Sequence, residues 1–101
     1  KPDTKIFTEK QFLLNTSYNK ISEDKDDVNV LIQGVVDLIL INGNEAIIID
    51  FKTNKTSNEM ALKQKYTLQL KCYELAVAEG FKVKVKSKML YLFNLNKFIS
   101  L

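Results

Sequence analysis

The sequence predicts an α/β fold with a mixed central sheet: three antiparallel strands, a crossover helix and a further strand. Three observations support this prediction. Two long apolar runs meet at an Asn-Gly turn signal, a segment of helical periodicity follows them, and an alternating Lys/Val run comes last. With 101 residues, 46% of them hydrophobic and 27% charged, the chain suits one globular domain over residues 1–101.

The first three strands are expected at Lys5–Asn15, at Val30–Ile41 and in the run that begins at Ala46. The second is apolar on both alternating sets of positions, which is typical of a central strand. The Asn-Gly-Asn-Glu stretch after it predicts a tight hairpin. A loop of two or of four residues places Asp37 directly opposite Asp50 on one face of the sheet. A three-residue loop without a bulge places them on opposite faces.

The helix is expected from Thr56 to Glu79. The stretch Thr56-Ser57-Asn58-Glu59 fits the capping box that opens a helix, and Gly80 is expected as the residue that closes it. One face of this helix carries residues at helical spacing: Leu62, Tyr66, Gln69, Leu70, Tyr73 and Val77. Outside any motif, a tyrosine on such a stripe is more often a core residue than a site residue.

The last strand is expected as one run over Val83–Leu95. Four lysines alternate at its beginning: Lys82, Lys84, Lys86 and Lys88. Lysines in this pattern more often protect an exposed sheet edge than contact DNA phosphates, and both interpretations stay open here.

The composition limits the chemistry that this chain can perform. All 15 basic residues are lysine, the net charge is +3, and histidine is absent. The commonest general base and transition-metal ligand is therefore missing, so any catalysis must use carboxylates, lysine, tyrosine or a hard metal ion. The single cysteine, Cys72, excludes an internal disulfide and favours a reduced cytoplasmic location. No apolar run reaches the ~18 residues of a membrane span.

Asp37, Asp50 and Lys52 form the strongest candidate site. Asp50 and Lys52 are two residues apart, so they share a face of their strand. Two carboxylates that meet in apolar surroundings repel each other, and oxygen ligands of this kind suit Mg²⁺ or Mn²⁺ rather than zinc. Lys52 would stabilise charge on a phosphoryl oxygen. The alternative is a buried ion-pair cluster without a catalytic role, but such clusters add little net stability, so three charges on one face favour chemistry.

Three short motifs follow one another in the chain: G-x-x-D at Gly34–Asp37, D-x-K-T at Asp50–Thr53 and Q-x-x-x-Y at Gln69–Tyr73. Together they resemble the motif set of the RecB-like branch of the PD-(D/E)xK nucleases. The stretch containing Glu9 and Phe12 resembles the E-x-x-F strand that precedes these motifs. Within this branch the chain is most similar to the AddA-type nuclease domains of bacterial helicase–nucleases.

The resemblance implies a PD-(D/E)xK nuclease-like core and assigns catalytic roles to Asp37, Asp50, Lys52, Gln69 and Tyr73. Asp37, Asp50 and the carbonyl of Phe51 would be metal ligands, and Lys52 would be the catalytic lysine. Gln69 and Tyr73 would line the site and position DNA. The family usually adds a metal-ligating histidine from a helix upstream of the first strand, whereas this chain contains no histidine.

The resemblance also implies Mg²⁺-dependent hydrolysis of DNA, exonuclease-type, with Mn²⁺ as a substitute. The DNA would be single strands fed by an ATP-driven helicase motor, in double-strand break repair and recombination. The chain would then be a C-terminal part of a longer polypeptide that works with a partner subunit of the AddB type and no membrane. Two alternatives remain: a non-catalytic DNA-binding or scaffold module of the same fold, and a part of an enzyme that is inert in isolation.

Overall fold

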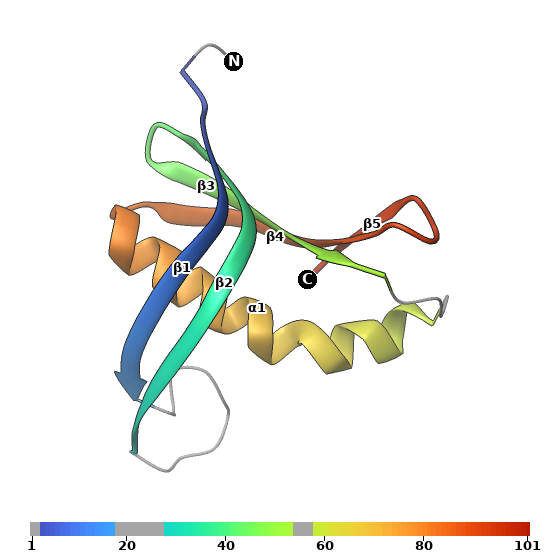
Figure 1. Ribbon diagram of the computed structural model, residues 1–101, viewed down its shortest axis with the longest axis horizontal. Coiled ribbons are helices and arrows are strands. Elements are labelled where there is room, and N and C mark those ends of the chain that lie inside the picture. Colours follow the sequence, from blue (N-terminus) through green and yellow to red (C-terminus); the bar gives the residue numbers. More distant parts are fainter. Residues whose placement is uncertain (1–2, 18–27, 54–57) are drawn as a thin grey trace.

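A computed structural model of the chain describes residues 3–17, 28–53 and 58–101. Its elements are β1 (Lys5–Ser17), β2 (Asn29–Asn42), β3 (Glu45–Lys52), α1 (Glu59–Phe81), β4 (Lys84–Leu92) and β5 (Lys97–Ser100). The strands form one sheet in the order β1-β2-β3-β4-β5, and α1 lies along one face of it (Figure 1). The β1/β2, β2/β3 and β4/β5 pairs are antiparallel and β3/β4 is parallel, which confirms the predicted α/β class and crossover.

The hairpin between β2 and β3 has the predicted two-residue loop. Asn42 pairs with Glu45 across Gly43-Asn44, and Gly43 has a φ of 64°, a left-handed conformation that glycine adopts without strain. The register continues from there to the pair Leu38↔Ile49. One further step along both strands places Asp37 opposite Asp50.

The hydrophobic core lies between the sheet and α1. Because side chains alternate along a strand, Ile39 and Ile48 point toward the helix while their neighbours point away. Each fully buried side chain of this size contributes about 1.5–3 kcal/mol. The core is made of one buried cluster: Val36, Ile39, Ile41, Ala46, Ile48, Leu62, Leu70, Tyr73, Val77, Leu90, Leu92 and Ile99. The predicted helix stripe is therefore confirmed as the buried face of α1.

Both ends of α1 differ from the prediction. The helix begins at Glu59 with Asn58 as N-cap, whose side chain accepts a hydrogen bond from the Ala61 amide at 3.1 Å, whereas residues 54–57, with the predicted cap Thr56, lie outside the described residues. At the other end Gly80 remains helical. The helix ends one residue later at Phe81, whose ring packs on that of Phe7 at 4.8 Å. This contact favours the longer helix, and Lys82 takes the left-handed capping position instead.

The single last strand predicted over Val83–Leu95 is wrong in two respects. First, β4 ends at Leu92, a turn follows over residues 93–96, and β5 returns alongside β4. Second, a β-bulge interrupts the pairing of β3 with β4: Val85 pairs with Ala46 and Ser87 with Ile47, so Lys86 is the extra residue.

The bulge separates the alternating lysines that the sequence places together. Lys84 and Lys86 are exposed. Lys88 lies beyond the bulge and contacts Glu74 of α1, with 2.7 Å between Nζ and Oε1. Lys88 is thus part of the interface between sheet and helix and does not continue the row of exposed lysines.

Candidate active site

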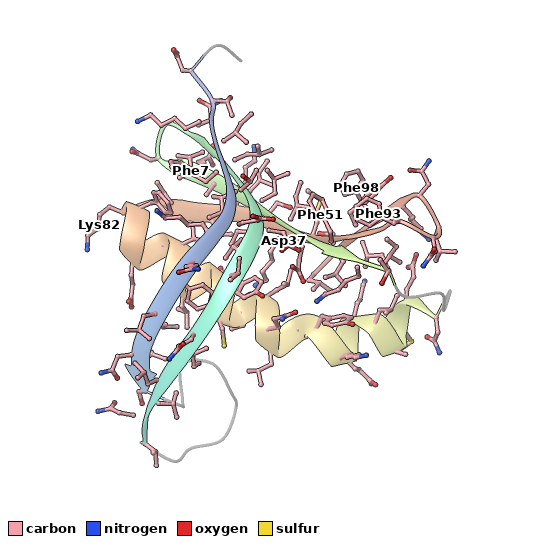
Figure 2. All side chains as sticks on the ribbon, viewed as in Figure 1. Phe7, Asp37, Phe51, Lys82, Phe93 and Phe98 are labelled. Carbon is pink, nitrogen blue, oxygen red and sulfur yellow. The ribbon has the colours of Figure 1, made fainter. Side chains whose placement is uncertain are left out.

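Three elements bring the predicted site residues together on the helix-covered face of the sheet. Asp37 comes from β2, Asp50 and Lys52 come from the end of β3, and Gln69 lies on α1 above them. Asp37 lies near the centre of the molecule, where β2 crosses α1 (Figure 2). The two-residue hairpin loop sets the strand register, and the register places the acids side by side.

Three groups surround the ammonium of Lys52. Its Nζ lies 2.9 Å from Asp50 Oδ2, donates a hydrogen bond to Gln69 Oε1 at 3.2 Å, and lies 4.3 Å from the centroid of the Tyr66 ring. The side chain of Lys52 is only 19% exposed. Gln69 therefore contacts the lysine directly, as the motif prediction requires of a residue that lines the site. Tyr66 was predicted only as part of the apolar stripe, although its spacing of three residues from Gln69 places both on one helix face.

Asp50 is the most constrained carboxylate in the described part of the chain. Its side chain is 4% exposed. The contact of Oδ2 with Lys52 lacks hydrogen-bond geometry, so this buried oxygen has no hydrogen-bond partner among the described residues. Burial raises the pKa of Asp50 to about 6, the neighbouring Asp37 contributes to that rise, and Lys52 opposes it.

Asp37 is half-buried and fixes the backbone beside Asp50. Its Oδ2 accepts a hydrogen bond from the Phe51 amide at 2.9 Å. This bond ties the ends of β2 and β3 together where their regular pairing stops. It also brings the Phe51 peptide next to both acids, which is where the predicted carbonyl ligand has to be.

Tyr73 is both a core residue and a neighbour of the acids. It is 7% exposed, and burial raises the pKa of its hydroxyl to about 12, with Asp50 and Asp37 adding to the effect. Its ring meets that of Phe12 edge-on at 5.4 Å. A Cβ added at Gly34 would lie 2.8 Å from the Phe12 ring, so the motif glycine makes room for this aromatic pair. Three motif letters thus have a shared packing role that sequence reasoning missed.

The donor set fits a hard divalent cation, although it is partial. Two carboxylates meet, and one of their oxygens is buried without a hydrogen-bond partner among the described residues, an arrangement that a cation would relieve. No group of three or more acidic, cysteine or histidine side chains that could hold a metal occurs among the described residues. The remaining positions would fall to backbone oxygen, water and substrate, as is usual for Mg²⁺. Glu9, the acid of the E-x-x-F resemblance, is exposed.

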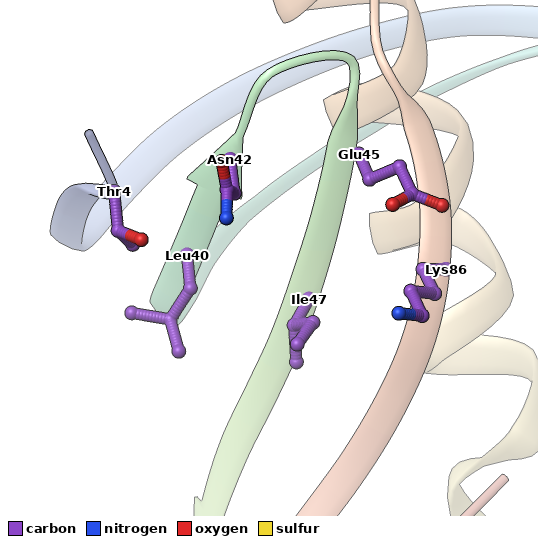
Figure 3. Close-up of a pocket in the computed structure, with 6 residues that line it drawn as sticks. All are labelled: Thr4, Leu40, Asn42, Glu45, Ile47 and Lys86. Carbon is purple, nitrogen blue, oxygen red and sulfur yellow. The ribbon is translucent and has the colours of Figure 1, made fainter. Parts of the chain in front are cut away.

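The opposite face of the sheet carries different chemistry. An open hollow of about 300 Å³ lies there, lined by Thr4, Leu40, Asn42, Glu45, Ile47 and Lys86 (Figure 3). It contains none of the predicted site residues. Further along this face, Phe51, Tyr91, Phe93 and Phe98 form an aromatic cluster with ring separations of 4.7–6.3 Å, and three of these rings are labelled beside β5 (Figure 2). The side chain of Phe51 thus points away from the acids that its backbone adjoins.

The fold and this site define a class: an α/β protein whose two central strands present two acids and a lysine to a helix bearing glutamine and tyrosine. Residues 3–99 match the family model described as the PD-(D/E)XK nuclease superfamily, and the chain belongs to this superfamily. Among the described residues no helix has the length and apolar character needed to cross a membrane.

The relatives that the chain matches confirm the AddA-type resemblance, since each is an ATP-dependent helicase/nuclease subunit of that type. The chain is 36% identical over 78 residues to the subunit of Clostridium acetobutylicum, covering 75% of this chain and 6% of that protein. It is 40% identical over 68 residues to the subunit of Clostridium kluyveri, covering 67% and 6%, and 39% identical over 74 residues to that of Desulfitobacterium hafniense, covering 67% and 5%. The chain spans about 6% of the length of the curated relatives it matches.

Proposed function

We propose that this chain is a Mg²⁺-dependent deoxyribonuclease domain that hydrolyses DNA phosphodiester bonds. The observation that carries the proposal is the buried oxygen of Asp50, without a hydrogen-bond partner among the described residues, in a carboxyl group that adjoins Asp37 and contacts Lys52. A fold that keeps two acids together under a helix has to offset their repulsion, and a bound cation does so.

Each residue has a distinct task in this hydrolysis. Asp37, Asp50 and the Phe51 carbonyl would hold the cation, which when bound would offset the negative charge of the scissile phosphate. The Lys52 ammonium places a fixed positive charge where a phosphate oxygen gains negative charge in the transition state. Gln69 accepts a hydrogen bond from Lys52 and so limits the directions in which that ammonium points. Tyr73 closes the site on the core side.

We further propose that the domain belongs to a longer helicase–nuclease that acts in double-strand break repair and recombination. The support is the likeness to helicase/nuclease subunits together with the small share of their length that the chain covers. In such an enzyme an ATP-driven motor would supply single-stranded DNA to this site, a partner subunit of the AddB type would complete the complex, and the work would take place in the cytoplasm.

The test is cleavage of end-labelled DNA by the longer protein with and without Mg²⁺, using Asp50→Asn as the site variant and Glu74→Gln as the matched control. Glu74 is an acid at the same sheet–helix interface but is paired with Lys88. We expect Asp50→Asn to lower the cleavage rate at least a hundredfold and Glu74→Gln to leave it unchanged. Equal rates in the two variants would rule the site out.

Metal binding is measured separately, by the shift of the melting temperature of this chain with millimolar Mn²⁺ or Ca²⁺. A cation that binds only the native state must raise the apparent stability. We expect the shift in the unchanged chain and in Glu74→Gln, and its loss in Asp37→Asn. Salt-sensitive DNA binding without cleavage in the longer protein would instead identify a non-catalytic module. Cleavage by the longer protein but not by this chain would mean that the chain is inert in isolation.

A further inference from the structure

The ammonium of Lys52 has a contact that no motif accounts for. Its Nζ lies 4.3 Å from the centroid of the Tyr66 ring, well inside the ~6 Å within which a cation is attracted to an aromatic face. Tyr66 is one helical turn before Gln69 on α1, so the helix presents an aromatic ring and an amide oxygen to the same ammonium. We propose that Tyr66 is a positioning residue that holds Lys52 in its working orientation.

Lysine needs such support more than most catalytic side chains do. Its ammonium is a point charge on a flexible four-carbon stem, and each contact that orients it has to overcome the entropy of that stem. The described contacts of Lys52 are Asp50 on its own strand and Gln69 and Tyr66 on α1. The ring therefore supplies one of the two contacts by which the helix, rather than the strand, sets the place of the ammonium.

The contact with Tyr66 also differs in kind from the contact with Asp50. Under the proposed function, on which this inference rests, Asp50 holds a cation, and a carboxylate that binds a cation attracts the neighbouring ammonium less strongly. An aromatic ring is not a ligand for a hard cation. The contact of Lys52 with the ring is therefore independent of the cation, while the contact with Asp50 is shared with it.

A purely structural role for Tyr66 is the competing explanation. The ring is half-buried and packs against the hydrophobic core, so it also contributes to stability. A packing role needs only apolar volume, which leucine supplies. A positioning role needs the electron-rich face of the ring, which phenylalanine keeps and leucine lacks. Tyr66→Phe and Tyr66→Leu therefore separate the two roles.

The first measurement uses this chain without metal or DNA. The NMR signals of the Lys52 ε-methylene group, which adjoins the ammonium, should be shifted upfield by the ring in the unchanged chain. The shift should persist in Tyr66→Phe and disappear in Tyr66→Leu. Phe98→Leu removes a ring on β5, 54% exposed, and serves as the matched control, which should leave the signals in place. No ring-dependent shift would overturn the proposal.

The second measurement is turnover in the longer protein. We expect kcat to fall roughly tenfold in Tyr66→Leu, corresponding to about 1.4 kcal/mol, with KM nearly unchanged, and to be restored in Tyr66→Phe. Equal losses in the two variants, or none in either, would overturn a positioning role for the ring. If the unchanged protein does not cut DNA, the proposed function fails, and the NMR result alone decides whether Tyr66 holds Lys52.

Discussion

Lys52 and Lys88 each bring an ammonium group into contact with a carboxylate at the interface between the sheet and α1, with similar distances of 2.9 and 2.7 Å. Their surroundings have opposite charge balance. Glu74, the partner of Lys88, has a second ammonium at 3.7 Å, that of Lys71, so two lysines face one acid. At Lys52 two acids, Asp50 and Asp37, adjoin one lysine.

Burial adds to this difference. The side chains of Lys88 and Glu74 are 21% and 27% exposed, so water solvates both charges in part. Asp50 is 4% exposed, and its Oδ2 is buried without a hydrogen-bond partner in the described part of the chain. The Lys88 pair is thus an ordinary stabilising contact. The Lys52 pair leaves an excess of buried negative charge, which is the property expected of a cation site rather than of a structural ion pair.

The largest expected effect separates the two lysines by activity. In the longer protein, Lys52→Met should lower the rate of DNA cleavage by more than a hundredfold, because removing one group that stabilises transition-state charge costs about 10²–10³. Lys88→Met removes the same charge from the same interface and should leave the rate within about twofold. Initial rates with saturating Mg²⁺ measure both. Similar losses in the two variants would remove the distinction between the pairs.

The next effect concerns pH. The pKa of Asp50 in the folded chain, about 6, is above its ordinary value of 3.8, so between these values the native state keeps a proton that the unfolded state has released. Its contribution to stability is therefore complete below about pH 4 and is lost as the pH rises through about 6, on the order of 2–3 kcal/mol. Urea unfolding at pH 4.5 and 7.5 measures it. The pH difference should be smaller in Asp50→Asn and unchanged in Glu74→Gln.

A third prediction compares two glycines. Gly34 lies under Phe12 and Tyr73 beside the site, and an added methyl group would lie 2.8 Å from the Phe12 ring, so Gly34→Ala should destabilise the fold by about 1–3 kcal/mol. Gly80 lies near the end of α1 with no atom within 4 Å of an added Cβ, and alanine is the better helix former. Gly80→Ala should stabilise by about 0.5 kcal/mol. Denaturant midpoints of both variants decide whether the site end of the fold is the tightly packed one.

The smallest effect is expected at the Lys88 pair. Glu74→Gln removes a partly exposed ion pair, so it should destabilise by at most about 1 kcal/mol, and high salt should reduce the difference. Urea titrations at low and high salt measure this. A loss well above that value would mean that the Lys88 pair is as critical to the fold as the Lys52 pair is to the site.

Much of the site was predictable because the interactions that form it are local. The Asn-Gly loop sets the β2/β3 register, and the alternation of side chains along a strand then puts Asp37, Asp50 and Lys52 on one face. The i,i+4 spacing of Gln69 and Tyr73 places them on one side of α1 in the same way. The roles of Gly34 and Phe12 were not predictable, since they arise where β1, β2 and α1 meet.

The sequence by itself determined the order of the elements, the hairpin register and the shared face of the three central charges, because turn chemistry and side-chain periodicity act over a few residues. Only the tertiary structure decided that a bulge at Lys86 turns Lys88 toward the helix, that β5 folds back on β4, and that Tyr66 lies against Lys52. These features depend on contacts between segments far apart in the chain, and no local pattern specifies the balance of packing and burial that selects among them.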